Sequence, residues 1–183
     1  MQQEIPTDTL TYSSTQRPIN FDDTTCDIVE EEFTEDEIKR VQSTWDLLHS
    51  TPLETALAIL ERSMEIFPEF RQFIQEFYTI SFEDIPEDIR CQKQALRVVK
   101  TVNTFVSGLN DIVKAKDFLF KLGKRHKTFG VKLNDFLAFR KSLLYVLDKK
   151  LSQLGYQYSE EDNNTWNKVL DTMLTHIVLG YNS

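Results

Sequence analysis

The chain has 183 residues, 40% of them apolar and 27% charged, which fits one globular domain with a tail. Its formal net charge of −8 resides in residues 1–37, where eleven acidic residues accompany one basic residue. The remaining eighteen acidic and twenty basic residues leave the body near neutral. We therefore predict neither a nucleic-acid partner nor a polybasic membrane contact.

The residue counts also favour an intracellular helical protein. Two cysteines are too few for a disulfide framework, and no apolar run is long enough for a membrane span. No signal peptide opens the sequence, so we expect a cytoplasmic protein. Thirteen phenylalanines with only five glycines and five prolines favour long helices over short strands.

Residues 1–33 carry Ser, Thr, Pro and acidic residues without a helical apolar spacing, which predicts a flexible acidic extension. We place the folded domain at residues 34–183. Its first helix is predicted by a capping box, in which Thr34 is followed three residues later by Glu37. The apolar positions of this helix recur at steps of three and four: Ile38, Val41, Trp45 and Leu48.

Thr51 and Glu54 form a second predicted capping box, with Pro52 at the first helical position. Pro68 interrupts the pattern of this second helix and is predicted to start a short third helix. The apolar face of the second helix consists of Ala56, Ile59, Leu60 and Met64.

Residues 88–109 have the spacing of a long helix. The stretch "KAKDFLFKLGKRH" repeats the helical step through Phe118 and Leu122, and residues 133–151 are again strongly apolar. A last helix is predicted from Ser159 to Gly180. The apolar face of the long helix is expected to contain Leu96, Val99, Val102, Phe105, Val106 and Leu109. The sequence therefore predicts an all-α fold.

Motifs of enzymes are absent from the sequence: it has no glycine-rich phosphate loop, no H-E-x-x-H, no paired cysteines with metal-ligand spacing and no nucleophile elbow. His126 is the residue most suited to chemistry. It lies one turn after Leu122, on the apolar side of its helix, although a solvated helix end rich in Lys and Arg is the other interpretation. Imidazole is the usual axial ligand of haem iron.

The stretch "LGKRHKTFGVKLNDFLAFRKSLLYVL", residues 122–147, resembles the segment around the proximal histidine in the globin family, particularly in the neuroglobin branch and its invertebrate relatives. Further resemblances lie at Trp45 and Trp166 in the first and last helices. Three more stretches resemble the second, third and distal helices of globins: "STPLE", "IFPEF" and "QALRVVKTVNTFVSGLND". Together they cover about residues 34–182.

This resemblance implies a globin fold of about seven to eight helices around a pocket for haem b (iron protoporphyrin IX), with His126 as the proximal iron ligand. The distal position falls on Gln94, four residues before Val98, which would overhang the iron. A carboxamide is a poor iron ligand, but its NH2 can donate a hydrogen bond to a gas ligand. We therefore expect a five-coordinate ferrous iron; the alternative is that Gln94 points to solvent and Lys93 or another group approaches the iron.

The resemblance also implies which side chains contact the haem. Leu60 would lie above the distal face, Leu122 and Val131 would lie beside the proximal histidine, and Phe139 would lie lower in the pocket. Arg97 either reaches a haem propionate or is a solvated helix charge. Globins place a phenylalanine against the haem six residues after the third-helix proline, where this chain has Ile74. Phe73 and Phe77 flank it, and a one-residue shift to Phe73 could restore the ring.

The resemblance implies a haem protein that reversibly binds O2, CO or NO, and oxygen transport is one role that such binding could serve. An alternative is a redox, NO-metabolising or gas-sensing globin working with a reductase or signalling partner. Nothing in the sequence supplies the distal acid–base pair or flavin domain of an efficient enzyme. A haem-free globin fold acting as an interaction module is the third alternative.

Overall fold

The computed structural model of the protein describes residues 32–69, 79–81 and 83–183. Six α-helices and short 3₁₀ turns, but no strand, occur in these residues, which confirms the all-α prediction. None of these helices is long and apolar enough to cross a membrane. The elements in chain order are α1 (Glu35–His49), α2 (Pro52–Ile66), α4 (Ile89–Ser107), η2 (Leu109–Asp111), α5 (Ile112–Thr128), α6 (Leu133–Gln153) and α7 (Glu160–Asn182).

Two predicted segments lie partly or wholly outside the described residues. The acidic extension predicted for residues 1–33 is described only at residues 32 and 33. Pro68 and Glu69 begin a 3₁₀ turn where the short third helix was predicted, and the structure describes nothing further until residue 79.

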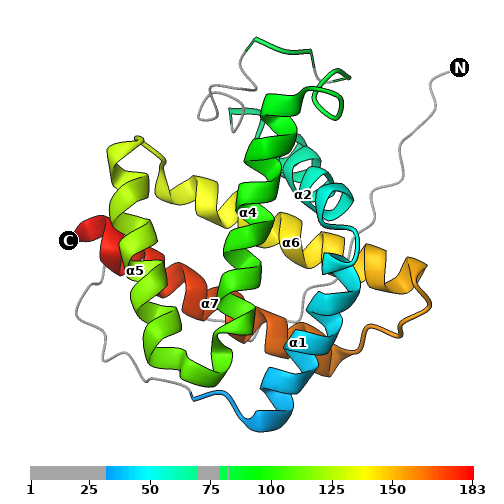
Figure 1. Cartoon of the computed structure of the whole chain (residues 1–183), viewed down its shortest axis with the longest axis vertical. Helices are drawn as coiled ribbons and strands as arrows, with labels where there is room; N and C mark the ends of the chain where they lie inside the picture. Colours follow the sequence, from blue (N-terminus) through cyan, green and yellow to red (C-terminus); the bar gives the residue numbers. More distant parts are fainter. Residues whose placement is uncertain (1–31, 70–78, 82) are drawn as a thin grey trace, which may run out of the picture. The chain divides into compact units, whose positions relative to one another are not determined.

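The helices pack as crossing pairs (Figure 1). α5 packs along α7, while α2 packs against both α6 and α4. α1 contacts α4 and α7, so that the first and last helices of the described chain lie together. α5 therefore rests on α7, whereas α4 packs against α1 and α2.

Capping chemistry starts the helices largely as the sequence predicts. In α1 the Glu37 N–H donates to Thr34 Oγ1 at 3.2 Å, and the Thr34 N–H donates to Glu37 Oε2 at 2.8 Å. The second predicted capping box is wrong: Thr51 is the N-cap of α2 but its side chain makes no capping hydrogen bond. Glu54 forms an ion pair with Lys150 of α6 at 2.8 Å, so its main partner is on another helix.

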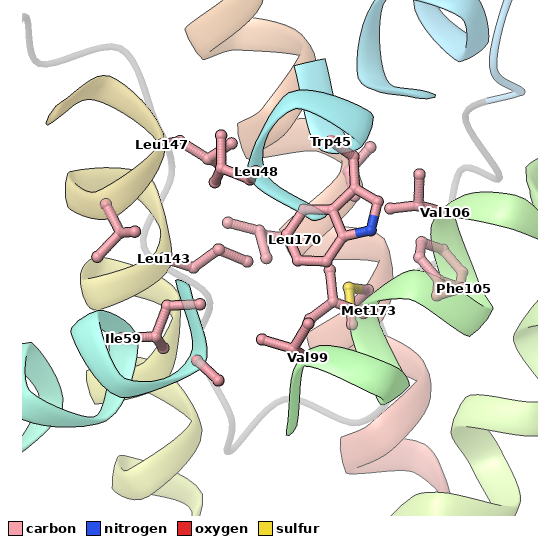
Figure 2. Close-up of a cluster of buried hydrophobic side chains, with 14 of the residues drawn as sticks. Trp45, Leu48, Ile59, Val99, Phe105, Val106, Leu143, Leu147, Leu170 and Met173 are labelled. Atoms are coloured by element: carbon pink, nitrogen blue, oxygen red, sulfur yellow. The ribbon is translucent and has the colours of Figure 1, made fainter. Parts of the chain in front are cut away.

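Two tryptophans anchor the core between α1 and α7. The rings of Trp45 and Trp166 are fully buried, with centroids 6.0 Å apart. Each indole N–H has a partner: that of Trp45 donates to Asn103 Oδ1 at 3.0 Å, and that of Trp166 donates to Thr44 Oγ1 at 2.9 Å. Figure 2 shows Trp45 among apolar side chains: Leu48 of its own helix, Val99, Phe105 and Val106 of α4, and Leu170 and Met173 of α7.

One position in the predicted apolar face of α4 is wrong. Leu96 is 37% exposed, whereas Ala95 is fully buried. Ala95 lies four residues before Val99, and both side chains belong to the core cluster. Leucine has the greater hydrophobicity, but the helical phase set by Val99 decides which of the two neighbours is buried.

Two glycines let α5 and α7 approach each other closely. A Cβ atom on Gly123 would overlap the carbonyl oxygen of Ile177, and a Cβ on Gly180 would overlap the carbonyl oxygen of Phe120. Gly180 was predicted to end the last helix, but α7 continues through it to Asn182. Gly180 is therefore needed for packing against the backbone of α5 at Phe120, and Gly123, three residues before His126, is needed for packing against α7.

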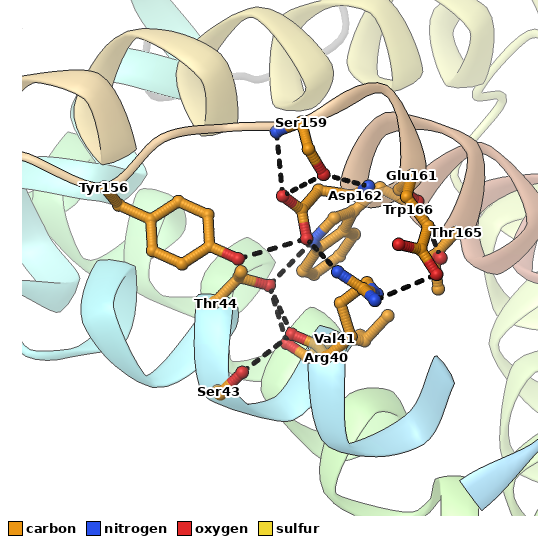
Figure 3. A network of polar contacts seen from close by, with 10 residues as sticks. All are labelled: Arg40, Val41, Ser43, Thr44, Tyr156, Ser159, Glu161, Asp162, Thr165 and Trp166. Atoms are coloured by element: carbon orange, nitrogen blue, oxygen red, sulfur yellow. Dashed lines mark hydrogen bonds and ion pairs between the residues drawn. The ribbon is translucent and has the colours of Figure 1, made fainter. Parts of the chain in front are cut away.

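A buried carboxylate ties the start of α7 to α1 (Figure 3). Asp162 is 1% exposed and accepts four hydrogen bonds: from the Ser159 N–H at 2.8 Å, the Ser159 hydroxyl at 2.7 Å, Arg40 Nη1 at 3.1 Å and the Tyr156 hydroxyl at 3.1 Å. Burial alone would raise the pKa of Asp162, but these donors outweigh burial and the pKa lies below its ordinary value of 3.8.

We expect Asp162→Asn to reduce the free energy of unfolding at pH 7 by about 2 kcal/mol, because the amide loses the charge-assisted hydrogen bonds. Because the pKa of Asp162 is lower in the folded than in the unfolded state, its carboxylate stabilises the fold at any pH above the unfolded pKa. This contribution is lost as the pH falls through the pKa of the folded state. Below about pH 4 the difference between Asp162→Asn and the unsubstituted protein should therefore shrink. Urea unfolding at pH 7 and pH 3 measures both effects.

The matched control is Asp117→Asn, because Asp117 is exposed and pairs only with Lys121 on the helix surface. Its effect should stay within about 0.5 kcal/mol at either pH. Equal stability of Asp162→Asn and the unsubstituted protein at pH 7 would contradict the stabilising role of the buried carboxylate.

Candidate functional site

His126 lies in the last turn of α5 with its ring half-buried. Its Nδ1 is 2.9 Å from the carbonyl oxygen of Leu122. Because a carbonyl oxygen can only accept, this contact requires the proton on Nδ1 and leaves the lone pair on Nε2. An imidazole with its outer N–H bonded to a carbonyl is the form in which histidine binds a metal.

The surroundings of His126 keep this imidazole neutral. Burial lowers the pKa of His126, the hydrogen bond to Leu122 acts in the opposite direction, and the positive charge of Arg125 lowers the pKa further. The net result is a pKa below the ordinary value of 6.5. At neutral pH the Nε2 lone pair is therefore available to an electrophile.

Phe136, near the start of α6, fixes the plane of the imidazole. The ring centroids of Phe136 and His126 are 5.3 Å apart, and the rings meet edge to face at 62°. The sequence places Phe136 only in an apolar helix. Its contact with His126 depends on how α6 packs, for which the sequence has no local signal.

A tight helix stop follows the histidine. The Gly130 N–H donates to the Lys127 carbonyl at 3.2 Å, and the Val131 N–H donates to the His126 carbonyl at 3.3 Å. This pair of bonds is the Schellman motif, which needs a residue with positive φ after the helix, and Gly130 has φ = +71°. The spacing His-x-x-x-Gly-Val thus encodes the end of α5 and holds half-buried Val131 beside the histidine.

On α4 the predicted distal residues share one face. Gln94 and Val98 are both half-buried and lie one helical turn apart. Leu60 of α2 is fully buried in the core. Lys93, the alternative candidate to approach a metal, is exposed.

Arg97 contacts Gln94 rather than standing free in solvent. Its Nη1 donates to Gln94 Oε1 at 2.9 Å, one helical turn away. Arg97 itself is exposed on α4. The sequence suggests either a propionate contact or a solvated charge for Arg97, and it gives no sign of this pairing.

The donor set suits a metal that is already held in a macrocycle. No group of three or more His, Cys, Asp or Glu side chains able to hold a metal ion occurs in the described part of the chain. A bare zinc-like ion needs three or four protein ligands, whereas a porphyrin supplies four nitrogens and needs one axial imidazole. The oriented Nε2 of His126 meets that need.

Half-buried apolar side chains on several elements are compatible with a large flat apolar cofactor. They come from α4, α5, the turn after α5, and α6, and each packs against the core while keeping some exposed surface: Val98, Leu122, Val131 and Phe139. Phe73, Ile74 and Phe77, the candidates for the residue stacked on the haem, lie outside the described residues.

A separate cavity of about 260 Å³ lies between α2 and α6. It contains none of the predicted site residues, and its lining mixes basic, polar and apolar side chains: Ala58, Tyr145, Val146, Lys149, Lys150 and Gln153.

An all-α fold with one oriented, neutral imidazole and apolar side chains from several helices is the arrangement of a haem-binding helical protein. A family model described as "Globin" matches residues 57–177, well over half of the chain. The chain therefore belongs to the globin family, whose fold binds haem and whose members bind gases such as O2.

Neuroglobins are among its relatives. The neuroglobin of Tetraodon nigroviridis is 25% identical over 144 residues, which cover 77% of this chain and 87% of the fish protein. The neuroglobin of Danio rerio is 23% identical over 154 residues, covering 82% and 94% of the two chains.

Solved structures show the same fold at low sequence identity. A hexa-coordinate haemoglobin of Drosophila melanogaster matches with a TM-score of 0.73 and 22% identity, over 79% of this chain and 93% of that one. A hexacoordinated haem protein from an anhydrobiotic tardigrade matches at 0.75 and 16%, over 82% and 96%. The haemoglobin of the botfly Gasterophilus intestinalis matches at 0.74 and 18%, over 82% and 100%.

We expect His126→Ala to weaken haem binding by at least roughly 10- to 100-fold. That range is the loss of affinity when a hydrogen-bond partner of a metal ligand is removed, and His126 is the expected ligand itself. The rate of haem transfer to an excess of a haem-scavenging apoprotein measures this. His176→Ala is the matched control, because His176 is also half-buried and its Nδ1 is also 2.9 Å from the carbonyl four residues earlier, that of Thr172. Haem retention that falls equally in both variants would show that His126 has no special role.

Proposed function

We propose that this chain is a haem b globin that reversibly binds O2, and also CO and NO, with His126 as the proximal iron ligand. The observation that carries the proposal is the hydrogen bond from His126 Nδ1 to the Leu122 carbonyl at 2.9 Å, in a chain of the globin family. It directs the free lone pair of Nε2 outward from α5, in the tautomer that an axial ligand requires.

The bound haem would supply the iron at which a diatomic gas binds. The chain's own residues would hold the haem and shape access to it. Leu122, Val131 and Phe139 would cover its faces on the proximal side, because their exposed apolar surface is stabilised by contact with a porphyrin. Val98 and Leu60 would narrow the distal entrance. Arg97 has further guanidinium donors besides Nη1 for a haem propionate.

Gln94 supports an open sixth position on the iron. A carboxamide is a weak ligand, and the exposed Lys93 is turned to solvent at the same end of α4. Two of the similar solved structures are described as hexacoordinate, so the coordination number is the property in which this chain would differ from them. The difference would come from glutamine at the distal place.

Gln94 would also be the hydrogen-bond donor to the gas ligand. Its NH2 can donate to an O2 ligand that carries partial negative charge.

We further propose that residues 34–183 form the functional domain, that residues 1–33 are a flexible acidic extension, and that the protein acts in the cytoplasm. A reductase or signalling partner would link gas binding to a redox or sensing role; a haem-free interaction module is the alternative that haem titration would reveal.

We expect Gln94→Leu to speed O2 dissociation about fivefold, because the ligand loses a hydrogen bond worth about 1 kcal/mol. Stopped-flow displacement of O2 by CO measures the rate. Gln153→Leu makes the same chemical change at an exposed position on α6 and should leave the rate unchanged. Unchanged O2 release from Gln94→Leu would contradict the proposed distal role.

A further inference from the structure

The two ends of a glutamine amide have opposite hydrogen-bonding properties. The NH2 end would donate to a gas ligand, whereas the oxygen end would repel the ligand's partial negative charge. A distal glutamine therefore works as a donor only when something holds its oxygen away from the ligand. Its position on α4 does not by itself select the amide orientation.

Arg97 provides that selection. A guanidinium has only donors, so the atom of Gln94 that lies 2.9 Å from Arg97 Nη1 must be the oxygen. With Oε1 engaged by Arg97, the Nε2 amide group is the end left for other partners. The two residues are three positions apart, which makes them neighbours on the helix surface.

The composition of α4 leaves Arg97 few competing acceptors. Residues 89–107 contain four basic residues and no acidic residue. The positions one turn away from Arg97 are Lys93, Gln94, Lys100 and Thr101, and the Thr101 hydroxyl already donates to the Arg97 carbonyl at 3.0 Å. The amide oxygen of Gln94 is thus the side-chain acceptor that the helix itself offers to Arg97.

Four other arginines of the described residues are paired differently. Their guanidinium groups form ion pairs with carboxylates: Arg40 with Asp162, Arg62 with Glu65, Arg90 with Asp88, and Arg140 with Asp171. The partner of Arg97 is a neutral amide that occupies the distal place. The pairing therefore bears on the proposed gas-binding site rather than on the charge balance of the helix surface.

We infer that Arg97 is a positioning residue that fixes the amide orientation of Gln94 and so makes Gln94 a hydrogen-bond donor to the gas ligand. This inference rests on the proposed function. Without Arg97 the amide can turn its oxygen toward the ligand for part of the time. The pair lies at an exposed position, where such contacts are weak, so the orientation is biased rather than locked.

The test is Arg97→Met in the full chain loaded with haem. We expect O2 dissociation to rise about twofold, the size set by a surface pair of this spacing. We also expect the C–O stretching band of the CO complex, measured by infrared spectroscopy, to split into two bands, one for each amide orientation. Arg97→Lys keeps a donor within reach of Oε1 and should restore the single band.

A double variant separates positioning from a direct effect of the Arg97 charge. In the Gln94→Leu background, Arg97→Met should leave O2 dissociation unchanged, because no amide remains to orient. A change of the same size in both backgrounds would overturn the inference. So would an unaltered rate and a single C–O band in Arg97→Met alone.

The same variants distinguish failure of this inference from failure of the proposed function. If Gln94→Leu speeds O2 release while Arg97→Met does not, the distal role of Gln94 stands and only the positioning role of Arg97 falls. If Gln94→Leu has no effect, the distal role fails and the inference fails with it. Haem transfer rates, measured alongside, report any separate contribution of Arg97 to holding a propionate.

Discussion

The hydrogen bond from His126 Nδ1 to the Leu122 carbonyl determines which ring nitrogen of His126 is free to bind a metal, and the surrounding structure keeps that bond in place. The Schellman turn at Gly130 ends α5 just after the histidine, and the Gly123 crossing sets the position of α5 on α7. Phe136 limits rotation of the ring from the side of α6. Each of these contacts would be lost through a small change in backbone position, so the site depends on helix packing as much as on the histidine itself.

The same hydrogen bond in His176 shows that local geometry is insufficient to make a ligand. His176 is half-buried on α7 and bonds the Thr172 carbonyl at the same distance, 2.9 Å. Two features accompany His126 alone: an aromatic ring at 5.3 Å that orients the imidazole, and a helix stop that brings Val131 alongside it. We propose that these two features, rather than the hydrogen bond within the helix that both histidines make, suit His126 to a porphyrin-held iron.

Features set by neighbouring residues could be predicted from the sequence, and features set by tertiary packing could not. The Thr34 capping box follows from local spacing, and the structure contains it. In α5 the predicted Phe118 and Leu122 are half-buried, and the fully buried positions lie one residue further along, at Leu119 and Gly123. Leu96 was misplaced because the helical phase of α4 is decided by what it packs against, and Thr51 was misassigned because Glu54 turns to a lysine of another helix. Gly180 resembles a helix end in the sequence, yet its role is visible only beside the backbone of α5. The distal position of Gln94 follows from the resemblance to globins and could not be predicted from residue spacing alone.

We propose that His126 binds haem iron on one side while the other side stays open to gas. Resonance Raman spectroscopy of the ferrous protein tests both parts at once, because an iron–histidine stretching band is characteristic of a five-coordinate haem with a neutral axial imidazole. We expect this band in the full chain, its loss in His126→Gly, and its return when free imidazole is added to that variant. A six-coordinate low-spin spectrum of the unsubstituted ferrous protein, or a band that persists in His126→Gly, would contradict it.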